Sequence, residues 1–294
     1  MEVNNDIYIS KRRAIAMTVA EFTPLVFAAA LLGGFVGSLT GLGGGVIITP
    51  VLTLFLGVDM RYAIGTSLIA VIATSSGAAA AYVRDGYSNI RIGMFLEIAT
   101  TLGAVAGAYL GAHMPTRALA IIFGIMLLEA AWQSAHDHQA SPGSFAGDGL
   151  AQRLRLNGAY RTPAGVENYE VRRVKTGFGL MLGAGLVSGL LGIGSGSLKV
   201  IAMDRAMRIP FKVSTATSNF MIGVTAAASA SLYLSRGYVH PAIIMPVMLG
   251  VLAGSMLGAR LLPKLGVPLL RKGFAIVVGL VAVEMIVSGI RGTI

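Results

Sequence analysis

The sequence contains no cysteine, so disulfide bonds, thiolate metal sites and cysteine nucleophiles are excluded. Histidine is scarce, with four residues, of which His136 and His138 lie two positions apart in a polar stretch. A metal site is one interpretation of this pair, and a solvated loop is the one we favour. No group of His, Asp and Glu in the apolar segments has metal-ligand spacing, and no serine there has an obvious base, so we do not expect an enzyme.

Charged residues are also few. They make up 12% of the chain, against about a quarter in soluble domains, whereas hydrophobic residues make up 55% and the mean hydropathy is +0.75. Glycine is abundant, at 39 residues, which suits helices whose backbones approach closely within a bilayer. The composition therefore predicts an all-α polytopic membrane protein.

The net charge is strongly positive, at +10 with a sequence pI of about 10.1. In a soluble protein this charge would suggest nucleic acid as a partner. Here the basic residues lie in short runs between apolar stretches, which favours anionic headgroups and cytoplasmic loops instead. The basic segment 1–20 leads through Glu21 and Pro24 into an apolar span without a convincing cleavage site, so we do not interpret it as a cleaved signal peptide.

Apolar runs close to the length of a membrane span, about 20 residues, recur along the chain. Two shorter runs, 45–57 and 196–203, each follow a glycine-rich stretch and predict half-helices or the second parts of broken helices. The full spans that we predict are 23–40, 63–83, 92–112, 117–134, 177–191, 213–234, 241–262 and 268–290.

The spans form two hydrophobic parts, 1–134 and 177–294, which a polar connector, 135–176, joins. Shifting the sequence by 151 residues aligns the two parts without a gap and predicts two tandem homologous halves. The matches are Gly41, Gly43 and Gly45 with Gly192, Gly194 and Gly196; Thr66 and Ser67 with Thr217 and Ser218; Gly86 and Tyr87 with Gly237 and Tyr238; and Gly103 and Gly107 with Gly254 and Gly258.

Each half contains five segments, an odd count that would place the two halves in opposite orientations. The positive-inside rule gives conflicting indications about the orientation of the halves. The basic run at 11–13 and the basic connector both favour the cytoplasm, which requires an even count, whereas the basic residues at 205–212 and 264–272 favour an odd one. We expect inverted repeats.

The glycine-rich breaks span 41–45 and 192–196, and each lies between the end of one helix and the start of the next. A helix that starts there presents unpaired N–H groups and the positive end of its dipole. Within hydrocarbon these donors need acceptors, and an anion held between two opposed N-termini would supply them. Packing alone is the alternative, to which we give less weight. A nucleotide-binding loop is excluded, because no Walker lysine follows the glycines and no strand precedes them.

Hydroxyl and amide side chains lie close to both breaks. A single Ser or Thr in a span often bonds to its own helix, but their placement at matching positions in the two halves favours a ligand. The predicted substrate-binding residues are Gly43, Gly44, Gly45, Thr66, Ser67, Gly194, Ser195, Gly196, Ser197, Lys199, Thr217, Ser218 and Asn219.

Lys199 is the most informative single charge. It lies three residues beyond Gly196 on a short apolar segment, and Ile48 is its equivalent in the first half. An ammonium group at that depth requires an anionic partner or access to water. A substrate anion is one such partner. Snorkelling to an interface, or pairing with Asp204, explains the residue equally well.

Three carboxylates lie in or near spans: Glu97, Glu129 and Glu284. Buried carboxylates can exchange protons near neutrality, so Glu97 and Glu129 are candidates for proton coupling. An ordinary interfacial position is the simpler interpretation of each. Glu97 lies within the first turns of its span, and the other two lie nearer the ends of theirs.

The segment from Gly33 through the break at 41–45 is followed by a helix containing Pro50 and then by Gly65-Thr66-Ser67. The second half repeats this order as far as 216–219. The pattern resembles the sulfite exporter TauE/SafE family over nearly the whole chain except the first twenty residues and the connector. The resemblance implies a bacterial inner-membrane carrier of sulfite, sulfonates or sulfoacetate that is driven by an ion gradient. The long basic connector departs from the family pattern.

We therefore expect a secondary transporter for a small anion, without a metal or other cofactor. An anion channel on the same scaffold and a cation carrier using Glu97 and Glu129 are the alternatives. The expected partners are the anion, the lipid bilayer, a coupling proton or sodium ion and a second copy of the chain in a homodimer, but not nucleic acid.

Overall fold

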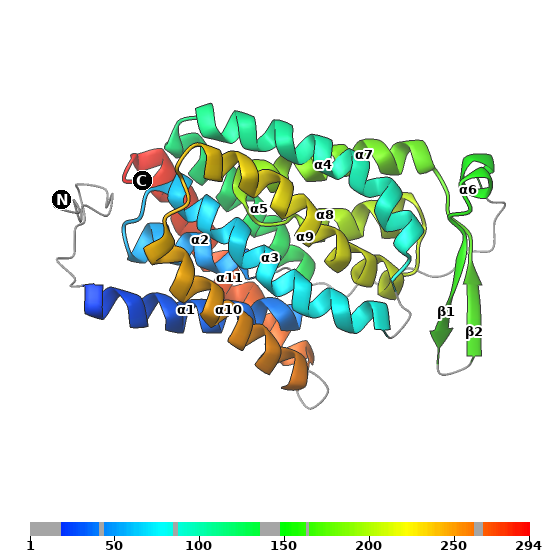
Figure 1. The fold of residues 1–294 in the computed structure, drawn as a ribbon, viewed down its shortest axis with the longest axis horizontal. Helices are drawn as coiled ribbons and strands as arrows, with labels where there is room; N and C mark the ends of the chain where they lie inside the picture. Colours follow the sequence, from blue (N-terminus) through cyan, green and yellow to red (C-terminus); the bar gives the residue numbers. More distant parts are fainter. Residues whose placement is uncertain (1–18, 41–43, 85–87, 136–147, 163–164, 262–266) are drawn as a thin grey trace.

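A computed structural model describes residues 19–40, 44–84, 88–135, 148–162, 165–261 and 267–294. Most of the helices run along the longest axis of the molecule, and a β-hairpin projects from one end (Figure 1). The helices before the hairpin are α1 (Val19–Thr40), α2 (Gly45–Pro50), the π-helix η1 (Val51–Phe55), α3 (Met60–Arg84), α4 (Ile90–His113), α5 (Thr116–Ala135) and α6 (Gly149–Arg153). The later elements are β1 (Gly158–Thr162), β2 (Gly165–Tyr169), α7 (Val174–Leu191), α8 (Gly196–Ile201), the π-helix η2 (Ala202–Ala206), α9 (Phe211–Ser235), α10 (Pro241–Leu261) and α11 (Val267–Arg291).

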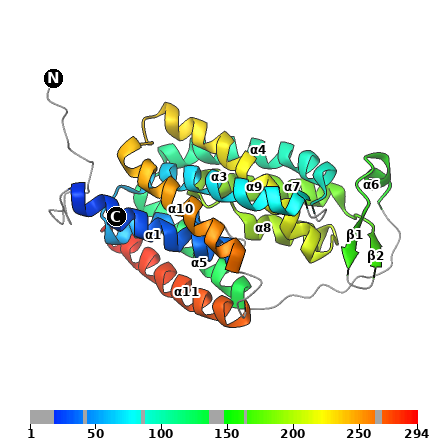
Figure 2. The ribbon, with the colours of Figure 1, turned by 60° about the horizontal axis from the view of Figure 1, so that its bottom comes forward.

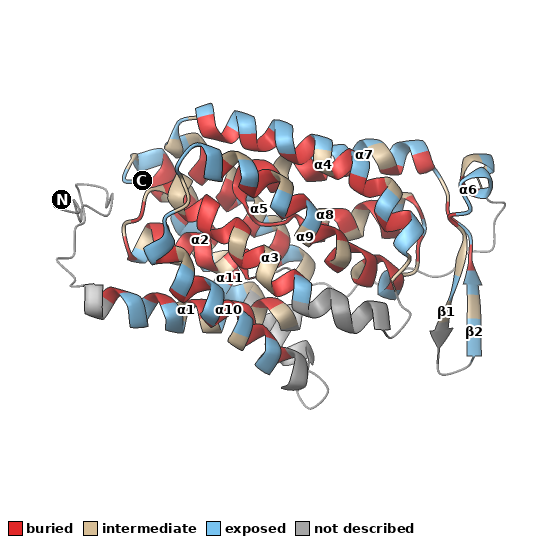
Figure 3. Cartoon of the chain, in the orientation of Figure 1, coloured by how far each residue is buried: buried red, intermediate tan, exposed pale blue. Residues whose placement is uncertain are grey.

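The helices have the length and composition of membrane spans. Four that lie within the described ranges are long and apolar enough to cross a bilayer: Ile90–His113, Thr116–Ser134, Val174–Leu191 and Pro241–Gly258. Large apolar side chains cover the outside of the bundle, among them Met94 at 63%, Trp132 at 65% and Leu280 at 68% exposure. Figure 3 shows exposed positions, in pale blue, along the outer helices. An apolar surface of this extent is unusual for a soluble monomer and suits contact with lipid.

The predicted spans agree closely with the helices, since each of the eight lies almost entirely within one helix. The two predicted half-helices are also present, with one difference. Each is α-helical for six residues and then continues as a five-residue π-helix. The wider turn ends in the same way in both halves, since Leu56 N–H donates to Val51 O and Met207 N–H donates to Ala202 O, both at 3.2 Å. Short π segments often mark functional sites.

The connector departs from the all-α expectation, because it contains the antiparallel hairpin β1–β2 and the short helix α6. This unit is docked on the end of the bundle. The Asn89 side-chain amide donates to the Tyr169 hydroxyl at 2.7 Å and to the Leu156 carbonyl at 3.2 Å. Apolar residues of the connector, such as Leu156 and Val171, join a buried cluster with the start of α4.

The element boundaries recur at the spacing of 151 residues. The elements α2, η1 and α3 begin at residues 45, 51 and 60, and α8, η2 and α9 begin at residues 196, 202 and 211. The starts of α4 and α5, at residues 90 and 116, correspond to those of α10 and α11 at residues 241 and 267. The duplicated sequence thus has a duplicated succession of helices.

Packing pairs the halves reciprocally: α1 packs against α10 and α4 against α7, while α3 packs against its counterpart α9 and α5 against α11. The close approaches repeat residue for residue. A Cβ at Gly185 would meet the Thr100 carbonyl, and a Cβ at Gly34 would meet the Val251 carbonyl. Gly103 and Gly107 abut α7 at Leu182 and Leu186, and Gly254 and Gly258 abut α1 at Leu31 and Phe35. These glycines allow direct backbone contact between spans.

The ends of the two halves can be followed along the body. Helix α1 begins and α11 ends at the end of the molecule away from the hairpin, whereas α7 begins next to the hairpin (Figures 1 and 2). The first half thus leads from one end of the body to the other, and the second half returns.

A valine at Gly185 should destabilise the protein, because its Cβ would overlap the backbone of α4 at Thr100. We expect a loss of about 3 kcal/mol or more, the upper end for overpacking, since backbone atoms cannot rotate away. Thermal unfolding in detergent would measure it. Gly183→Val on the same helix is the matched control, because Gly183 has no neighbour within 4 Å. Equal effects of the two substitutions would contradict this packing.

Burial raises the pKa of the Tyr169 phenol above its ordinary value, against the opposing effect of the hydrogen bond from Asn89. The folded state favours the neutral phenol. The contribution of this group to the free energy of unfolding is therefore present at neutral pH and is lost as the pH rises through the raised pKa. Subtracting the ultraviolet absorbance titration of Tyr169→Phe from that of the wild type isolates this group. Asn89→Ala should raise the pKa further, and a lower value would contradict the docking geometry.

Candidate functional site

The second glycine break is enclosed by the protein. Residues 188–197 are all buried. The backbone turns through three residues of positive φ, Gly192 at +73°, Gly194 at +71° and Ser195 at +43°. Glycine tolerates this conformation, whereas at Ser195 it is strained, and the Ser195 hydroxyl compensates by donating to the Ala184 carbonyl at 2.6 Å. In the first break, Gly43 and its two preceding neighbours lie outside the described residues, and Gly44 caps α2.

The two breaks meet at the centre of the bundle. The Ser67 hydroxyl, on α3 of the first half, donates to the Gly192 carbonyl at 2.9 Å. A Cβ at Gly45 would lie 3.1 Å from the same carbonyl oxygen and would overlap the Ser67 hydroxyl. The start of α2, the middle of α3 and the turn before α8 therefore converge, although about 150 residues separate the breaks in sequence.

The start of α8 presents donors that lack backbone acceptors. Its first amide with a carbonyl partner in the described part of the chain is that of Lys199, which donates to Ser195 O at 3.1 Å. The amides of Gly196, Ser197 and Leu198 have no such partner there. Unpaired N–H groups at a buried helix start form a site for negative charge.

Most of the predicted hydroxyl and amide residues hold the backbone around the breaks. Ser218 donates to the Gly196 carbonyl at 3.2 Å, and Asn219 donates to the Thr215 carbonyl at 3.1 Å. Thr217 accepts from the Asn89 amide at 3.0 Å, which ties α9 to the loop before α4. Thr66 differs: its side chain is completely buried, and no described residue offers its hydroxyl a hydrogen bond.

Lys199 does not snorkel, since its exposure is 0%. Its ammonium group donates to the Thr225 hydroxyl at 2.6 Å, and the same hydroxyl lies 2.7 Å from Glu97 Oε1. Opposite charges on α8 and α4 are therefore bridged by one hydroxyl on α9. Thr101 adds a second donor to Glu97 Oε1 at 3.2 Å.

Glu97 is buried among the helices and does not lie on the outer surface of the bundle. It is 8% exposed and faces the bundle interior, because α4 packs that side against α9. Its Oε2 atom is buried and has no hydrogen-bond partner among the described residues. The favourable interaction with the Lys199 charge partly offsets the cost of burying the carboxylate.

The other two carboxylates lie in different surroundings. Glu129 is partly buried and accepts from the Ser197 hydroxyl at 3.3 Å, with the charge of Arg205 nearby. Glu129 is therefore linked to α8 one residue beyond the second break. Glu284 is exposed and bonds to Ser288 on its own helix. Glu284 does not contact Lys199, Thr225 or Glu97.

Thr225, the residue that bridges Lys199 and Glu97, is not among the site residues predicted from the sequence. A signal for it exists, because Thr225 lies seven residues after Ser218 on the same face of α9, and Thr74 holds the equivalent position after Ser67 on α3. Thr74 bonds only to carbonyls of its own helix, Ala70 and Val71. The threonine therefore occurs in both halves, but only Thr225 has charged partners.

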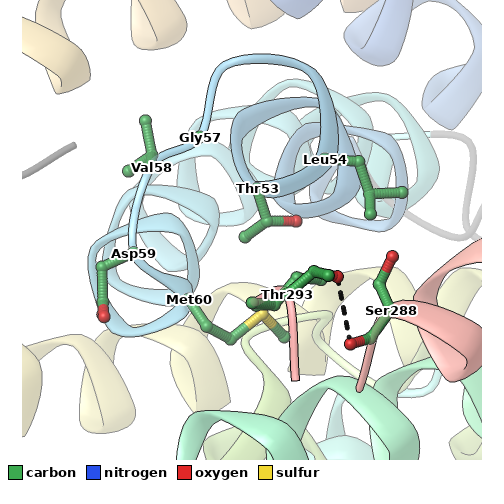
Figure 4. Close-up of a pocket in the computed structure, with 9 residues that line it drawn as sticks. Thr53, Leu54, Gly57, Val58, Asp59, Met60, Ser288 and Thr293 are labelled. Atoms are coloured by element: carbon green, nitrogen blue, oxygen red, sulfur yellow. Dashed lines mark hydrogen bonds between the residues drawn. The ribbon is translucent and has the colours of Figure 1, made fainter. Parts of the chain in front are cut away.

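A small cavity of about 70 Å³ lies apart from the breaks, at the end of η1. Figure 4 shows Thr53, Asp59 and Met60 on one side and Ser288 and Thr293 on the other, with the Thr293 hydroxyl donating to the Ser288 carbonyl. Its walls come from η1, the start of α3 and the end of α11. None of the predicted substrate-binding residues lines it.

Comparison with known proteins places these features in a family. The family model described as "Sulfite exporter TauE/SafE" matches residues 26–285. The probable membrane transporter protein YunE of Bacillus subtilis (strain 168) is 29% identical over 267 residues, which cover 88% of this chain and 96% of the relative. A probable membrane transporter protein of Xylella fastidiosa (strain 9a5c) is 27% identical over 275 residues, or 92% and 97% of the two chains.

An archaeal relative extends the comparison. The probable membrane transporter protein MJ0441 of Methanocaldococcus jannaschii is 25% identical over 278 residues, or 90% of this chain and 95% of the relative. No solved structure matches significantly. The matched family model spans both helical halves and both helix breaks, and the chain, a multi-pass membrane protein, belongs to the sulfite exporter TauE/SafE family.

Proposed function

We propose that this protein is a secondary transporter that moves a small sulfur-containing anion, such as sulfite or an organosulfonate, across the bacterial inner membrane. The observation that carries the proposal is the buried start of α8, where the amides of Gly196, Ser197 and Leu198 lack backbone acceptors and Lys199 is fully enclosed. Non-helical backbone survives at membrane depth only where protein buries it or where it lines a cavity. A bound anion would complete the hydrogen bonding of this break.

An oxyanion suits these groups better than a simple halide. A sulfite or sulfonate group carries three oxygen atoms, which can accept hydrogen bonds from amides, a hydroxyl and an ammonium group at once. Thr66, whose buried hydroxyl has no partner among the described residues, and Lys199 supply donors of the last two kinds. The sulfur chemistry itself is inferred from the description of the family.

The transport cycle requires two orientations of one site, and we propose that the two halves are inverted repeats that provide them. The reciprocal packing of α1 with α10 and of α7 with α4 supports this arrangement. The opposite directions in which the halves cross the body support it too (Figure 1). The contact of Ser67 with Gly192 near the middle of the bundle supports a substrate site to which both halves contribute.

Transport against a gradient requires a coupling ion, and Glu97 and Glu129 are the groups that could bind a proton. Both are hydrogen-bonded to groups on or beside α8, Glu97 through Thr225 to Lys199 and Glu129 directly to Ser197. A sodium ion is the other candidate. An anion channel is the alternative function, and the complete burial of residues 188–197 favours the carrier, which closes around its substrate.

Purified protein in liposomes should transport labelled sulfite, methanesulfonate or sulfoacetate with saturable kinetics, and acetate should compete weakly. Saturation and counterflow exchange identify a carrier, whereas fast flux that is linear in concentration identifies a channel. Failure of all three anions to move, with a reconstituted and folded protein, would overturn the proposal. A flux that depends on a cation and ignores the anion would point to the cation carrier instead.

Thr66→Val should weaken transport without weakening the fold. The substitution removes a buried hydroxyl that has no partner among the described residues, so stability should stay equal or rise, while the lost bond to a charged substrate should raise KM about tenfold. Thr74→Val on the same helix is the matched control, because the Thr74 hydroxyl bonds only to its own helix. Equal KM values for Thr66→Val and the wild type would exclude Thr66 from the site.

A further inference from the structure

The 151-residue repeat relates each residue of the central charged pair, Lys199 and Glu97, to an uncharged residue. Lys199 and Glu97 have Ile48 and Met248 as their equivalents 151 residues away, whereas the bridging Thr225 has an equivalent in Thr74. Neither equivalent is charged: Ile48 is buried, and Met248 lies on the exposed side of α10. Two charges in the interior are costly to bury, so their presence on one side calls for a role beyond packing.

Both charged groups also have unused hydrogen-bonding capacity. The Lys199 ammonium has three donors, and its described partner is the single hydroxyl of Thr225. Glu97 is more than nine-tenths buried, and its Oε2 atom has no partner in the described ranges. A completed ion pair would use these groups on each other. The cluster instead leaves donors of the ammonium free for a further acceptor and one carboxylate oxygen free for a proton.

The Thr225 hydroxyl can serve either protonation state of Glu97 without moving. It accepts a hydrogen bond from Lys199 and lies 2.7 Å from Glu97 Oε1 and 2.9 Å from the Met221 carbonyl. Its one proton points to Glu97 when that carboxyl is ionised. When Glu97 is protonated at Oε1, Glu97 donates to Thr225 and the threonine proton turns to Met221.

We propose that the substrate anion replaces the Glu97 carboxylate as the counter-ion of Lys199, and that Glu97 takes up one proton as this exchange occurs. The proposal rests on the anion transport proposed above and specifies its coupling. Before binding, the cluster holds one ammonium and one carboxylate. After binding, it holds one ammonium, one substrate anion and a neutral carboxylic acid. The enclosed charge is zero in both states, so one proton accompanies each singly charged anion and the transport step is electroneutral.

The groups around the cluster are mostly uncharged, and the buried Asp204 on η2 is not among the charges that act on Lys199 or Glu97. From α9, Thr225 and Ser229 face it, and both are uncharged. From α4, Thr100 and Thr101 lie beside Glu97. From the described part of α7, no charged side chain lies at this depth, since Lys175 is exposed near the helix start. Glu129 and Arg205 are reached only through Ser197 and are partly or fully exposed.

Binding-linked proton uptake tests the exchange directly. The probe is methanesulfonate, whose own charge stays constant, bound to the purified full-length protein in detergent. Calorimetry in buffers of different ionisation enthalpy counts the protons taken up. The wild type should take up about one proton per anion, and its affinity should fall as the pH rises. In liposomes, an inward proton gradient should drive methanesulfonate uptake, and an imposed membrane potential should not.

Glu97→Gln imitates the protonated state. This variant should bind methanesulfonate at least as tightly as the wild type, take up no proton, and lose the response of flux to a pH gradient while retaining counterflow exchange. Glu284→Gln is the control, because that carboxylate is exposed and remote from the cluster.

Lys199→Met should abolish binding. Thr225→Ser should keep the proton count and Thr225→Val should lower it, which tests the bridge even if the glutamate variant fails to fold.

The outcomes separate this coupling from the transport function. Sulfite or sulfonate flux with no proton uptake on methanesulfonate binding would overturn the exchange and leave the transporter standing. A proton count that persists in Glu97→Gln and disappears in Glu129→Gln would also overturn it, because the proton would then belong to the other carboxylate. The absence of any anion flux or binding in folded protein would overturn both proposals.

Discussion

The hydrogen bond from the Ser67 hydroxyl to the Gly192 carbonyl is the interaction on which the centre of this protein depends. A membrane helix that is interrupted exposes carbonyl and amide groups that lipid cannot satisfy, so another part of the protein must cover them. Here α3 of the first half covers the break of the second half, at 2.9 Å. The contact joins the first half to the break of the second half, which could not persist in lipid without such a partner.

Duplication explains the scaffold, and its exceptions indicate where the chemistry lies. Glycine contacts between α4 and α7 recur between α1 and α10 at equivalent residues, which is expected when one ancestral unit pairs with its copy. The Lys199, Thr225 and Glu97 cluster breaks this equivalence, because only the threonine recurs. In the transport cycle that we propose, the symmetric scaffold would provide two similar states for alternating access, and the asymmetric charge pair would provide one proton route per site.

Much of the fold could be predicted from sequence because local signals specify it. Span-length apolar runs predicted the eight long helices, and glycine-rich stretches predicted the short helices that follow both breaks, whereas α6 and the hairpin of the connector were not predicted. The burial of Glu97 could not be predicted in this way. It lies eight residues into α4, where a carboxylate can equally face an interface, and only the packing of α4 against α9 turns it inward. The contact with Lys199 joins three separate helices, and no local pattern encodes it.

The same packing restricts how the molecule can move. In each of the pairs α1–α10 and α4–α7, a glycine of one half lies directly against the backbone of the other, so either pair resists separation. Two rigid sequence halves rocking against each other would have to break both pairs. The α3–α9 contact at the centre uses side chains instead, such as Ser75 against Gly223. We therefore expect the moving units to be mixed, each with helices from both halves, and the substrate site that we propose at the breaks to lie between them.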